Sequence, residues 1–520
     1  MCLAGEVCQT EKDISSKFFY RVDSLDQIIS FRLKKLQRLR DKGIAPYPAK
    51  ANRTMRVDEF MLKFLALKKE GKAITLVGRL MALREFGGLT FAQLRDGYGE
   101  TQVLFKKDEL GKRAYEDLAL LDIGDIVQTR GTAMLTKKGE KTLLVNKLVL
   151  LTKSLRPLPE KWYGLTDQET RFRQRFLDLL FNSDVKERFV VRSNLVQALR
   201  EFLLKRDFIE VDTPALQPVP GGALAQPFKT RYNAINADVY LRIAPELYLK
   251  RLIIGGFERV FEFARVFRNE GVSTQHLQDF TMLEFYQAYA DYEDLMKMTE
   301  EMFSYMLKKV FGTTKIKYGG GPSAKLGTST TVLDFKTPWP RTTFRELIMK
   351  HAGIDIDKFP KVEELQAAIK KKKIKLTYSG KAGRGKLIDE LYKETARDKL
   401  INPVFLTDHP LDLSPLAKQK DIAPDKVQRF QLVVAGMEIV NAFSELNDPI
   451  DQKERFKEQT KLKKAGDAEA HSMDEDFVKA LEYGMPPTAG WGMGVERLLA
   501  ILTNAESVRE AVLFPFVKSK

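Results

Sequence analysis

The chain has 520 residues, of which 86 are lysine or arginine and 70 are aspartate or glutamate, so its formal net charge is +16 at pH 7. This length predicts about three domains, and the basic excess favours a polyanionic partner, with nucleic acid ahead of a membrane surface. No apolar run of about 18 residues occurs and the first residues lack a secretory pattern, so we expect a cytoplasmic protein without a membrane-spanning helix.

The first predicted element is a helix that begins after Ser24. The spacing of Ser24 and Gln27 is typical of a capping box, and apolar residues recur at three- and four-residue intervals from Leu25 to Leu39. Gly43 ends the pattern. The other face of the helix is basic, so it is either a solvated surface or an RNA-facing one. Cys2 and Cys8 precede this helix and match no metal spacing.

Five short strands are predicted next, separated by turns that contain glycine. Five strands of this length predict a small closed barrel, and the OB-fold is the five-stranded barrel that binds oligonucleotides on one face. The predicted strands cover residues 74–81, 89–94, 101–105, 126–134 and 142–150.

A larger α+β unit follows a proline-containing linker at residues 152–167. We expect a helix over residues 186–205 and strands at 208–212, 239–243, 258–266, 431–438 and 486–494, with a flexible glycine loop at 319–331. The fold class is therefore α+β: a helix and an OB-fold barrel, then an antiparallel sheet flanked by helices. The expected domains are 1–60, 61–155 and 156–520, with an inserted region at about 343–399.

Two segments of the α+β unit invite functional interpretations that their residues do not support. Residues 380–387 nearly spell a phosphate-binding loop, but Leu387 stands where that loop needs serine or threonine to hold Mg²⁺. The lysine run at 370–373 is typical of a solvated helix face.

The chain has four histidines, none spaced as a metal pair, so zinc catalysis is not expected.

Two arginines at strand ends are the strongest chemical signal. Arg268 follows an apolar run at residues 259–266, and Arg497 follows a glycine-rich segment at 490–494. A guanidinium group keeps its charge and its planar fork matches phosphate oxygens. If both arginines point into one pocket, that pocket suits a polyphosphate.

Acidic residues near the arginines predict a cationic ligand. Glu284 and Tyr286 are two residues apart, so they share one face of a strand, and the same holds for Asn441, Phe443 and Glu445. Carboxylates on the inner face of a sheet are unfavourable unless a cation or a metal accompanies them.

From Leu25 to about Pro515 the chain resembles class II lysyl-tRNA synthetases. The helix predicted over residues 186–205, together with residues 208–214, resembles motif 1 of that class. Residues 267–270 resemble motif 2, and residues 490–497 resemble motif 3. Two longer strings, 240–251 and 441–448, are more specific for the lysine enzyme.

The resemblance implies ATP-dependent formation of lysyl adenylate and its transfer to the 3′ end of tRNA(Lys). Arg268, Glu270 and Arg497 would be the catalytic residues. Arg268 would bridge the α-phosphate and the lysine carboxylate, and Arg497 would hold the γ-phosphate. Phe280 and Arg497 would enclose adenine, with Glu270 and His276 nearby.

The resemblance also implies the other ligand sites. Glu445 and Tyr286 would receive the ε-ammonium group of lysine. The remaining lysine-binding residues would be Gly222, Glu246, Arg268, Glu284, Asn441 and Phe443. Glu438 would bind both ATP and Mg²⁺, and Glu445 would be a second metal ligand. The anticodon would contact Arg84, Phe91 and Gln102, and motif 1 would form a homodimer interface.

Several residues depart from the family pattern. Gln275 replaces a usual arginine, which predicts one missing phosphate contact, and Gln431 replaces a usual metal-binding carboxylate, which leaves the number of Mg²⁺ ions open. A catalytically silent RNA-binding paralogue is therefore an alternative. A lysyl transferase acting on a protein is another, although such relatives lack an anticodon barrel. The other departures are Gln226, Asp279, Trp491 and Glu496.

Overall fold

The computed structural model describes residues 24–159, 167–271, 273–319, 331–376, 383–464 and 472–518. The chain divides between Thr166 and Asp167 into two compact units. Cys2, Cys8, most of the predicted glycine loop (320–330) and the start of the segment that resembles a phosphate-binding loop (380–382) lie outside the described residues. Within the described ranges, no helix is both long and apolar enough to cross a membrane.

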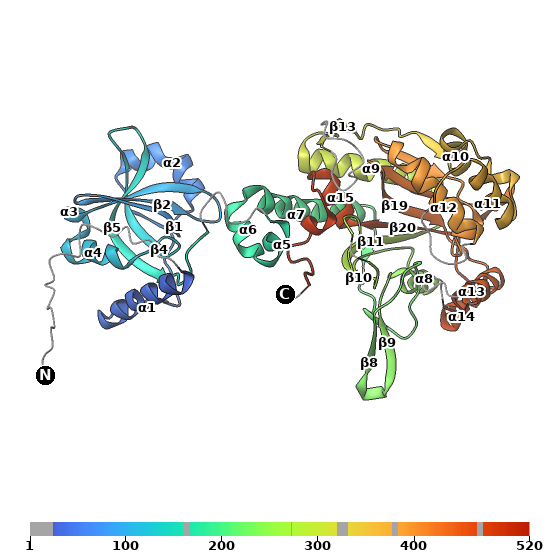
Figure 1. Cartoon of the computed structure of the whole chain (residues 1–520), viewed down its shortest axis with the longest axis horizontal. Helices are drawn as coiled ribbons and strands as arrows, with labels where there is room; N and C mark the ends of the chain where they lie inside the picture. Colours follow the sequence, from blue (N-terminus) through green and yellow to red (C-terminus); the bar gives the residue numbers. More distant parts are fainter. Residues whose placement is uncertain are drawn as a thin grey trace, which may run out of the picture. The chain divides into compact units, whose positions relative to one another are not determined.

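The first unit begins with two helices that pack on the barrel (Figure 1). Helix α1 (Leu25–Asp41) starts with the predicted capping box: the Gln27 amide donates to Ser24 Oγ at 3.3 Å, and the Ser24 amide donates to Gln27 Oε1 at 3.2 Å. Helix α2 (Val57–Glu70) follows. Leu39, Phe60 and Phe64 enter the same apolar core as the strands, so the helices belong to the barrel unit.

All five predicted strands of the barrel are present and close it in the order β1-β2-β3-β5-β4. Alternate residues point into the core, as Ala92 and Leu94 do on the second strand. The strands are β1 (Ile74–Phe86), β2 (Leu89–Arg95), β3 (Glu100–Lys106), β4 (Ile126–Leu135) and β5 (Lys141–Thr152), with α3 (Lys107–Leu110), α4 (Lys112–Glu116) and η1 (Asp117–Leu120) between β3 and β4.

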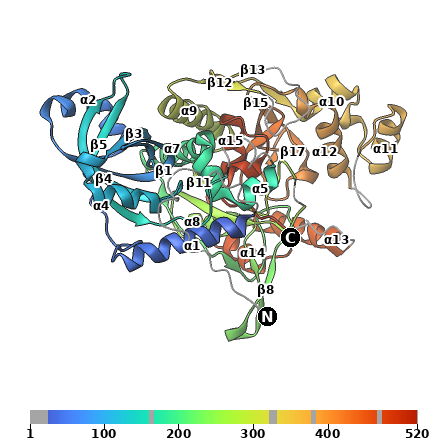
Figure 2. The ribbon, with the colours of Figure 1, turned by 60° about the vertical axis from the view of Figure 1, so that its left-hand side comes forward.

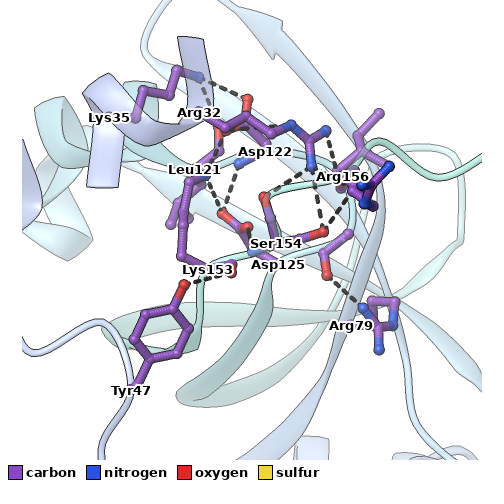
Figure 3. A network of polar contacts seen from close by, with 12 residues as sticks. Arg32, Lys35, Tyr47, Arg79, Leu121, Asp122, Asp125, Lys153, Ser154 and Arg156 are labelled. Atoms are coloured by element: carbon purple, nitrogen blue, oxygen red, sulfur yellow. Dashed lines mark hydrogen bonds and ion pairs between the residues drawn. The ribbon is translucent and has the colours of Figure 1, made fainter. Parts of the chain in front are cut away.

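A polar network joins α1 to the chain that leaves the barrel (Figure 3). Arg32 donates to the carbonyl oxygens of Ser154 at 3.0 Å, Arg156 at 3.1 Å and Ile123 at 3.1 Å. Below it, the Lys153 ammonium lies 2.8 Å from the fully buried Asp125 carboxylate. Because every one of these polar groups has a partner, the network fixes the helix on the barrel.

The second unit is built on an eight-stranded sheet in the order β14-β15-β18-β19-β20-β11-β10-β6. Neighbouring strands are antiparallel except for the parallel pairs β14–β15 and β10–β6, which confirms the predicted sheet. The predicted strand at 208–212 is shorter than expected. The strands are β6 (Ile209–Glu210), β10 (Arg259–Phe267), β11 (Asp279–Ala288), β14 (Arg341–Thr343), β15 (Val404–Thr407), β18 (Arg429–Val434), β19 (Met437–Ser444) and β20 (Thr488–Gly494).

Helices α7 (Ser183–Leu204), α9 (Tyr292–Phe311) and α15 (Val495–Leu502) bury one face of this sheet in a single large core. Phe285 of β11 and Trp491 of β20 stack within it, with ring centroids 4.8 Å apart. The remaining elements surround the sheet: α5 (Gln168–Arg173), α6 (Arg175–Phe181), β7 (Leu216–Gln217), β8 (Lys229–Tyr232), η2 (Asn233–Ile235), β9 (Ala237–Leu241), α8 (Glu246–Ile254), β12 (Lys315–Tyr318), β13 (Thr331–Asp334), η5 (Leu411–Leu413), β16 (Gln419–Lys420), β17 (Ala423–Val427), α13 (Pro449–Lys464), α14 (Glu475–Glu482) and η6 (Val508–Ala511).

The region expected to be an insertion is helical (Figure 2). It has its own apolar core. Leu406 of β15 and Val433 of β18 also belong to that core, so the region is anchored on the sheet. The lysine run at 370–373 is exposed at the end of one of its helices, as predicted. The elements are α10 (Phe344–Ala352), η3 (Ile356–Lys358), α11 (Val362–Lys371), α12 (Arg384–Thr395) and η4 (Arg397–Lys399).

Candidate active site

A cavity of about 520 Å³ lies on the sheet face that α7, α9 and α15 leave open. Its floor is the glycine-rich strand β20, in which Gly490 is paired in register with Tyr286 and Gly492 with Glu284. Trp491 alternates with these glycines and is buried in the core on the opposite face. The two glycines therefore leave room for a ligand above the middle of the sheet.

Arg268 and Arg497 both line this one cavity, as the sequence interpretation required. Arg268 Nε and Nη2 each lie 3.4 Å from the Ile243 carbonyl oxygen, and its guanidinium carbon is 5.2 Å from the centre of the Phe280 ring. Arg497 Nη1 donates to the Glu438 carbonyl oxygen at 3.3 Å. Burial lowers the pKa of Arg268, and Glu270 opposes that shift. An arginine nevertheless stays charged in proteins, so the cavity holds two fixed cations.

The other residues expected to bind ATP also line the cavity: Glu270, His276, Phe280 and Glu438. His276 Nδ1 and Ser273 Oγ are 2.8 Å apart. Partial burial, together with Arg497 and three other cations, lowers the pKa of His276 to about 4. Its imidazole is therefore neutral at pH 7 and can accept or donate a hydrogen bond.

Carboxyl groups form an acidic part of the same cavity. Glu246, at the start of α8, packs against Gly222, where an added Cβ would stand 2.8 Å from the Glu246 Cβ. Tyr286 donates to Glu284 Oε2 at 3.2 Å. Burial, with the nearby Glu246, raises the pKa of Glu284 well above its usual range. A cation bound here would favour the ionised form of Glu284.

Glu445 lies beside Gly490 and Tyr286, on the side of the floor that faces the cavity. Its Oε1 atom would be 2.1 Å from a Cβ at Gly490 and has no hydrogen-bond partner among the described residues. The fully buried Lys250 pairs its ammonium with Glu445 and, at 2.5 Å, with Glu246. Two carboxyl groups thus share one resident ammonium, and Glu284 lies close enough to Glu246 to be influenced by its charge. Further positive charge bound here would favour the ionised forms of these groups.

Glu438 is the stronger of the two predicted metal ligands. Its Oε2 atom accepts a hydrogen bond from Gln431 Nε2 at 2.6 Å, beside the cavity. A carboxylate and an amide oxygen suit Mg²⁺, whereas Glu445 is already paired with an ammonium. Over the described residues, no three acidic, histidine or cysteine side chains form a preassembled metal site. The residues present fit an ion that brings ligands of its own, such as phosphate oxygens and water.

The remaining predicted lysine-binding residues, Asn441 and Phe443, line the cavity. Arg429 Nε donates to Asn441 Oδ1 at 2.7 Å and was not predicted. Lys250 was also missed, although its spacing of four from Glu246 in a helical segment is a readable signal. Three charged residues of the inserted region also line the cavity: Asp389, Lys393 and Arg397.

The predicted anticodon residues share the outer face of the barrel. Arg84 of β1 is paired in register with Phe91 of β2, and Gln102 of β3 with Gln93, two residues from Phe91. Phe86 was not predicted, yet it is 61% exposed and contacts Phe91 edge to face, with ring centroids 6.1 Å apart. These side chains form a surface on which bases can stack.

Comparison with known proteins gives matches over both units. A family model described as tRNA synthetases class II (D, K and N) matches residues 167–518, and one described as an OB-fold nucleic acid binding domain matches residues 74–151. Among curated proteins, the lysine–tRNA ligase of Pelotomaculum thermopropionicum is 47% identical over 500 residues, covering 96% of each chain. That of Moorella thermoacetica is 46% identical over 502 residues, covering 96% of this chain and 99% of its own. That of Clostridium novyi is 45% identical over 518 residues, covering 99% of both.

Proposed function

The chain belongs to the class II tRNA synthetases of the aspartate, lysine and asparagine group, and we propose that it is an enzyme that attaches L-lysine to tRNA(Lys) using ATP. The observation that carries this proposal is one cavity in which two fixed guanidinium groups adjoin a cluster of carboxyl groups. Lysine–tRNA ligases that match nearly the whole chain support it further.

In the first step, a carboxylate oxygen of lysine attacks the α-phosphorus of ATP. The bond between the α-phosphorus and the oxygen that bridges it to the β-phosphate breaks, and pyrophosphate leaves. This step needs positioning and charge neutralisation rather than a protein nucleophile. Arg268 shares the cavity with Glu284 and Arg497 and interacts electrostatically with both. It would hold the lysine carboxylate next to the α-phosphate.

In the second step, a ribose hydroxyl of the tRNA 3′ end attacks the carbonyl carbon of lysyl adenylate and AMP leaves.

Glu438 would hold Mg²⁺, which supplies positive charge to the phosphates when bound. The number of ions stays open because Gln431 offers a neutral oxygen. Arg84, Phe91 and Gln102 would bind the anticodon, with a stacked base contributing about 1–3 kcal/mol.

Selectivity for lysine follows from the charge of the acidic residues. The substrate carries two ammonium groups. Glu246, Glu284 and Glu445 outnumber the single ammonium group of Lys250 by two, so the two substrate charges would balance them. We assign the α-ammonium to Glu246 and Glu284, and the ε-ammonium to Glu445 and Tyr286. A neutral side chain would leave the buried Glu445 Oε1 atom without a hydrogen-bond partner, which strongly disfavours its binding.

We also propose a homodimer through the motif 1 region. Strand β6 is the edge of the eight-stranded sheet, and Ile209 on it is 50% exposed. Val190 of α7 and Leu216 of β7 are likewise exposed. An exposed apolar sheet edge favours association with a second chain. Light scattering of the purified protein tests this state, and a monomer at micromolar concentration would contradict it.

An ATP–pyrophosphate exchange assay with each of the twenty amino acids tests the activity. We expect exchange with lysine alone in the presence of Mg²⁺. Exchange with another amino acid would show that the acidic residues are misassigned. Failure with all twenty would favour the catalytically silent paralogue. Lysine-dependent exchange without charging of tRNA(Lys) would favour transfer to a protein.

A further inference from the structure

The inserted region contributes side chains to the cavity although its sequence suggested a separate addition. Asp389 and Lys393 are four residues apart on α12, and Arg397 follows after another four residues at the start of η4. Residues at this spacing lie on one side of a helix, and all three line the cavity together with Arg268 and Arg497.

Arg397 presents a donor that the protein itself does not satisfy. Its Nε atom is buried and has no hydrogen-bond partner among the residues that the structure describes. A buried donor without a partner is unfavourable and calls for an explanation. Because this donor belongs to a cation at a cavity wall, an anion in the cavity would satisfy it and gain a planar fork of hydrogen bonds.

Lys393 is a second cation held in place on the same wall. Its ammonium lies 2.6 Å from Asp389 and 3.1 Å from Glu390, and these carboxylates fix its position. Although burial opposes its charge, Asp389 and Glu390 raise the pKa of Lys393 above its usual value. Lys393 is therefore charged when a ligand arrives.

The two cations share their surroundings with Arg497. Arg497, Lys393, Arg397 and Arg268 all line the cavity with His276, and all four act electrostatically on its imidazole. Of these, Arg268 also interacts with the acidic residue Glu284. The pyrophosphate part of ATP is more highly charged than its α-phosphate and would suit the cations that do not act on Glu284.

We propose that Arg397 and Lys393 bind the β- and γ-phosphates of ATP together with Arg497. This inference rests on the proposed function, because it concerns the same nucleotide site. Arg397 and Lys393 would supply the positive charge that is lost at position 275, where Gln275 replaces a usual arginine. It also gives the inserted region a role, since its helix α12 would recognise the group that leaves in the first step.

The test compares R397Q and K393M with K399M, which removes an exposed lysine that does not line the cavity. Binding of inorganic tripolyphosphate is measured by calorimetry, and the KM values for ATP and lysine by pyrophosphate exchange. A non-hydrolysable sulfamoyl analogue of lysyl adenylate, which lacks the β- and γ-phosphates, serves as an internal control. Losing a charge-assisted hydrogen bond should weaken ATP and tripolyphosphate binding by about tenfold or more.

We expect R397Q and K393M to leave the KM for lysine and the affinity for the sulfamoyl analogue unchanged, with R397K recovering part of the loss. Unchanged tripolyphosphate binding in both variants would overturn the proposal. A loss shared equally by ATP and the analogue would also overturn it, because a misfolded site would weaken both. If the wild type shows no exchange with any amino acid, the proposed activity fails. The calorimetric comparison still decides the phosphate contacts.

Discussion

The pairing of Lys250 with two buried carboxylates predicts a large and pH-dependent loss of stability when this lysine is replaced by methionine. Methionine has a similar length but no charge. The Lys250 side chain is fully buried and contacts Glu246 at 2.5 Å as well as Glu445. Removing one partner of a buried ion pair costs about 3–5 kcal/mol, because the other charge stays buried without compensation. We expect a loss of this size for K250M at pH 7.

The pH dependence follows from the two carboxyl groups. Burial raises the pKa of Glu246, and it raises that of Glu445 well above its usual range, while Lys250 opposes both shifts. Without Lys250, both folded-state values rise further. A raised folded-state pKa contributes stability that is complete below the unfolded value of about 4.3 and is lost as the pH rises. The difference between K250M and wild type should therefore be small near pH 4 and grow towards pH 8.

Urea unfolding followed by tryptophan fluorescence measures this difference, since Trp339 and Trp491 are buried in the core of the second unit. The matched control is K399M, which changes an exposed lysine and should alter stability by less than about 0.5 kcal/mol. A K250M variant that unfolds within about 1 kcal/mol of wild type at pH 7, the range of exposed pairs, would refute the buried pairing. A difference that does not change with pH would refute the assigned role of the carboxyl groups.

Three further predictions concern the substrate sites. E445Q should raise the KM for lysine in pyrophosphate exchange by roughly tenfold to a hundredfold by weakening a charged contact, and equal changes for ATP would argue against the assignment. G490A should destabilise the fold by about 1–3 kcal/mol in thermal unfolding, because its Cβ would be 2.1 Å from Glu445 Oε1 and 2.4 Å from Tyr286 Cε1. G492A is its control, with the nearest atom at 3.5 Å, and equal losses would contradict the geometry. F91A should raise the KM for tRNA by roughly fivefold to a hundredfold, as expected for one stacked base, while exchange without tRNA is unchanged; normal charging across a tRNA titration would count against the anticodon surface.

Local patterns predicted the sheet and the barrel because successive side chains of a strand point to opposite faces, so apolar residues recur at every second position. The alternation of Glu284 with Phe285, and of Gly490 with Trp491, separates the cavity face from the core face. A reader of the sequence can recognise that alternation without knowing which strands become neighbours.

Residues that meet only through the tertiary fold could not be predicted in this way. Lys250 and Glu445 are 195 positions apart in sequence, and no local pattern relates them. Arg397 lies in a region that the sequence marks as inserted, and only the packing of α12 beside the sheet brings it to the cavity.

The network around Arg32 has a practical consequence for anyone who wishes to study anticodon recognition with a shortened protein. A fragment that starts at the first strand would remove the guanidinium that satisfies the carbonyl oxygens of Ile123, Ser154 and Arg156. It would also open the buried Asp125 and Lys153 pair to water. A fragment intended to keep the barrel intact should therefore begin before Ser24 and extend past Arg156.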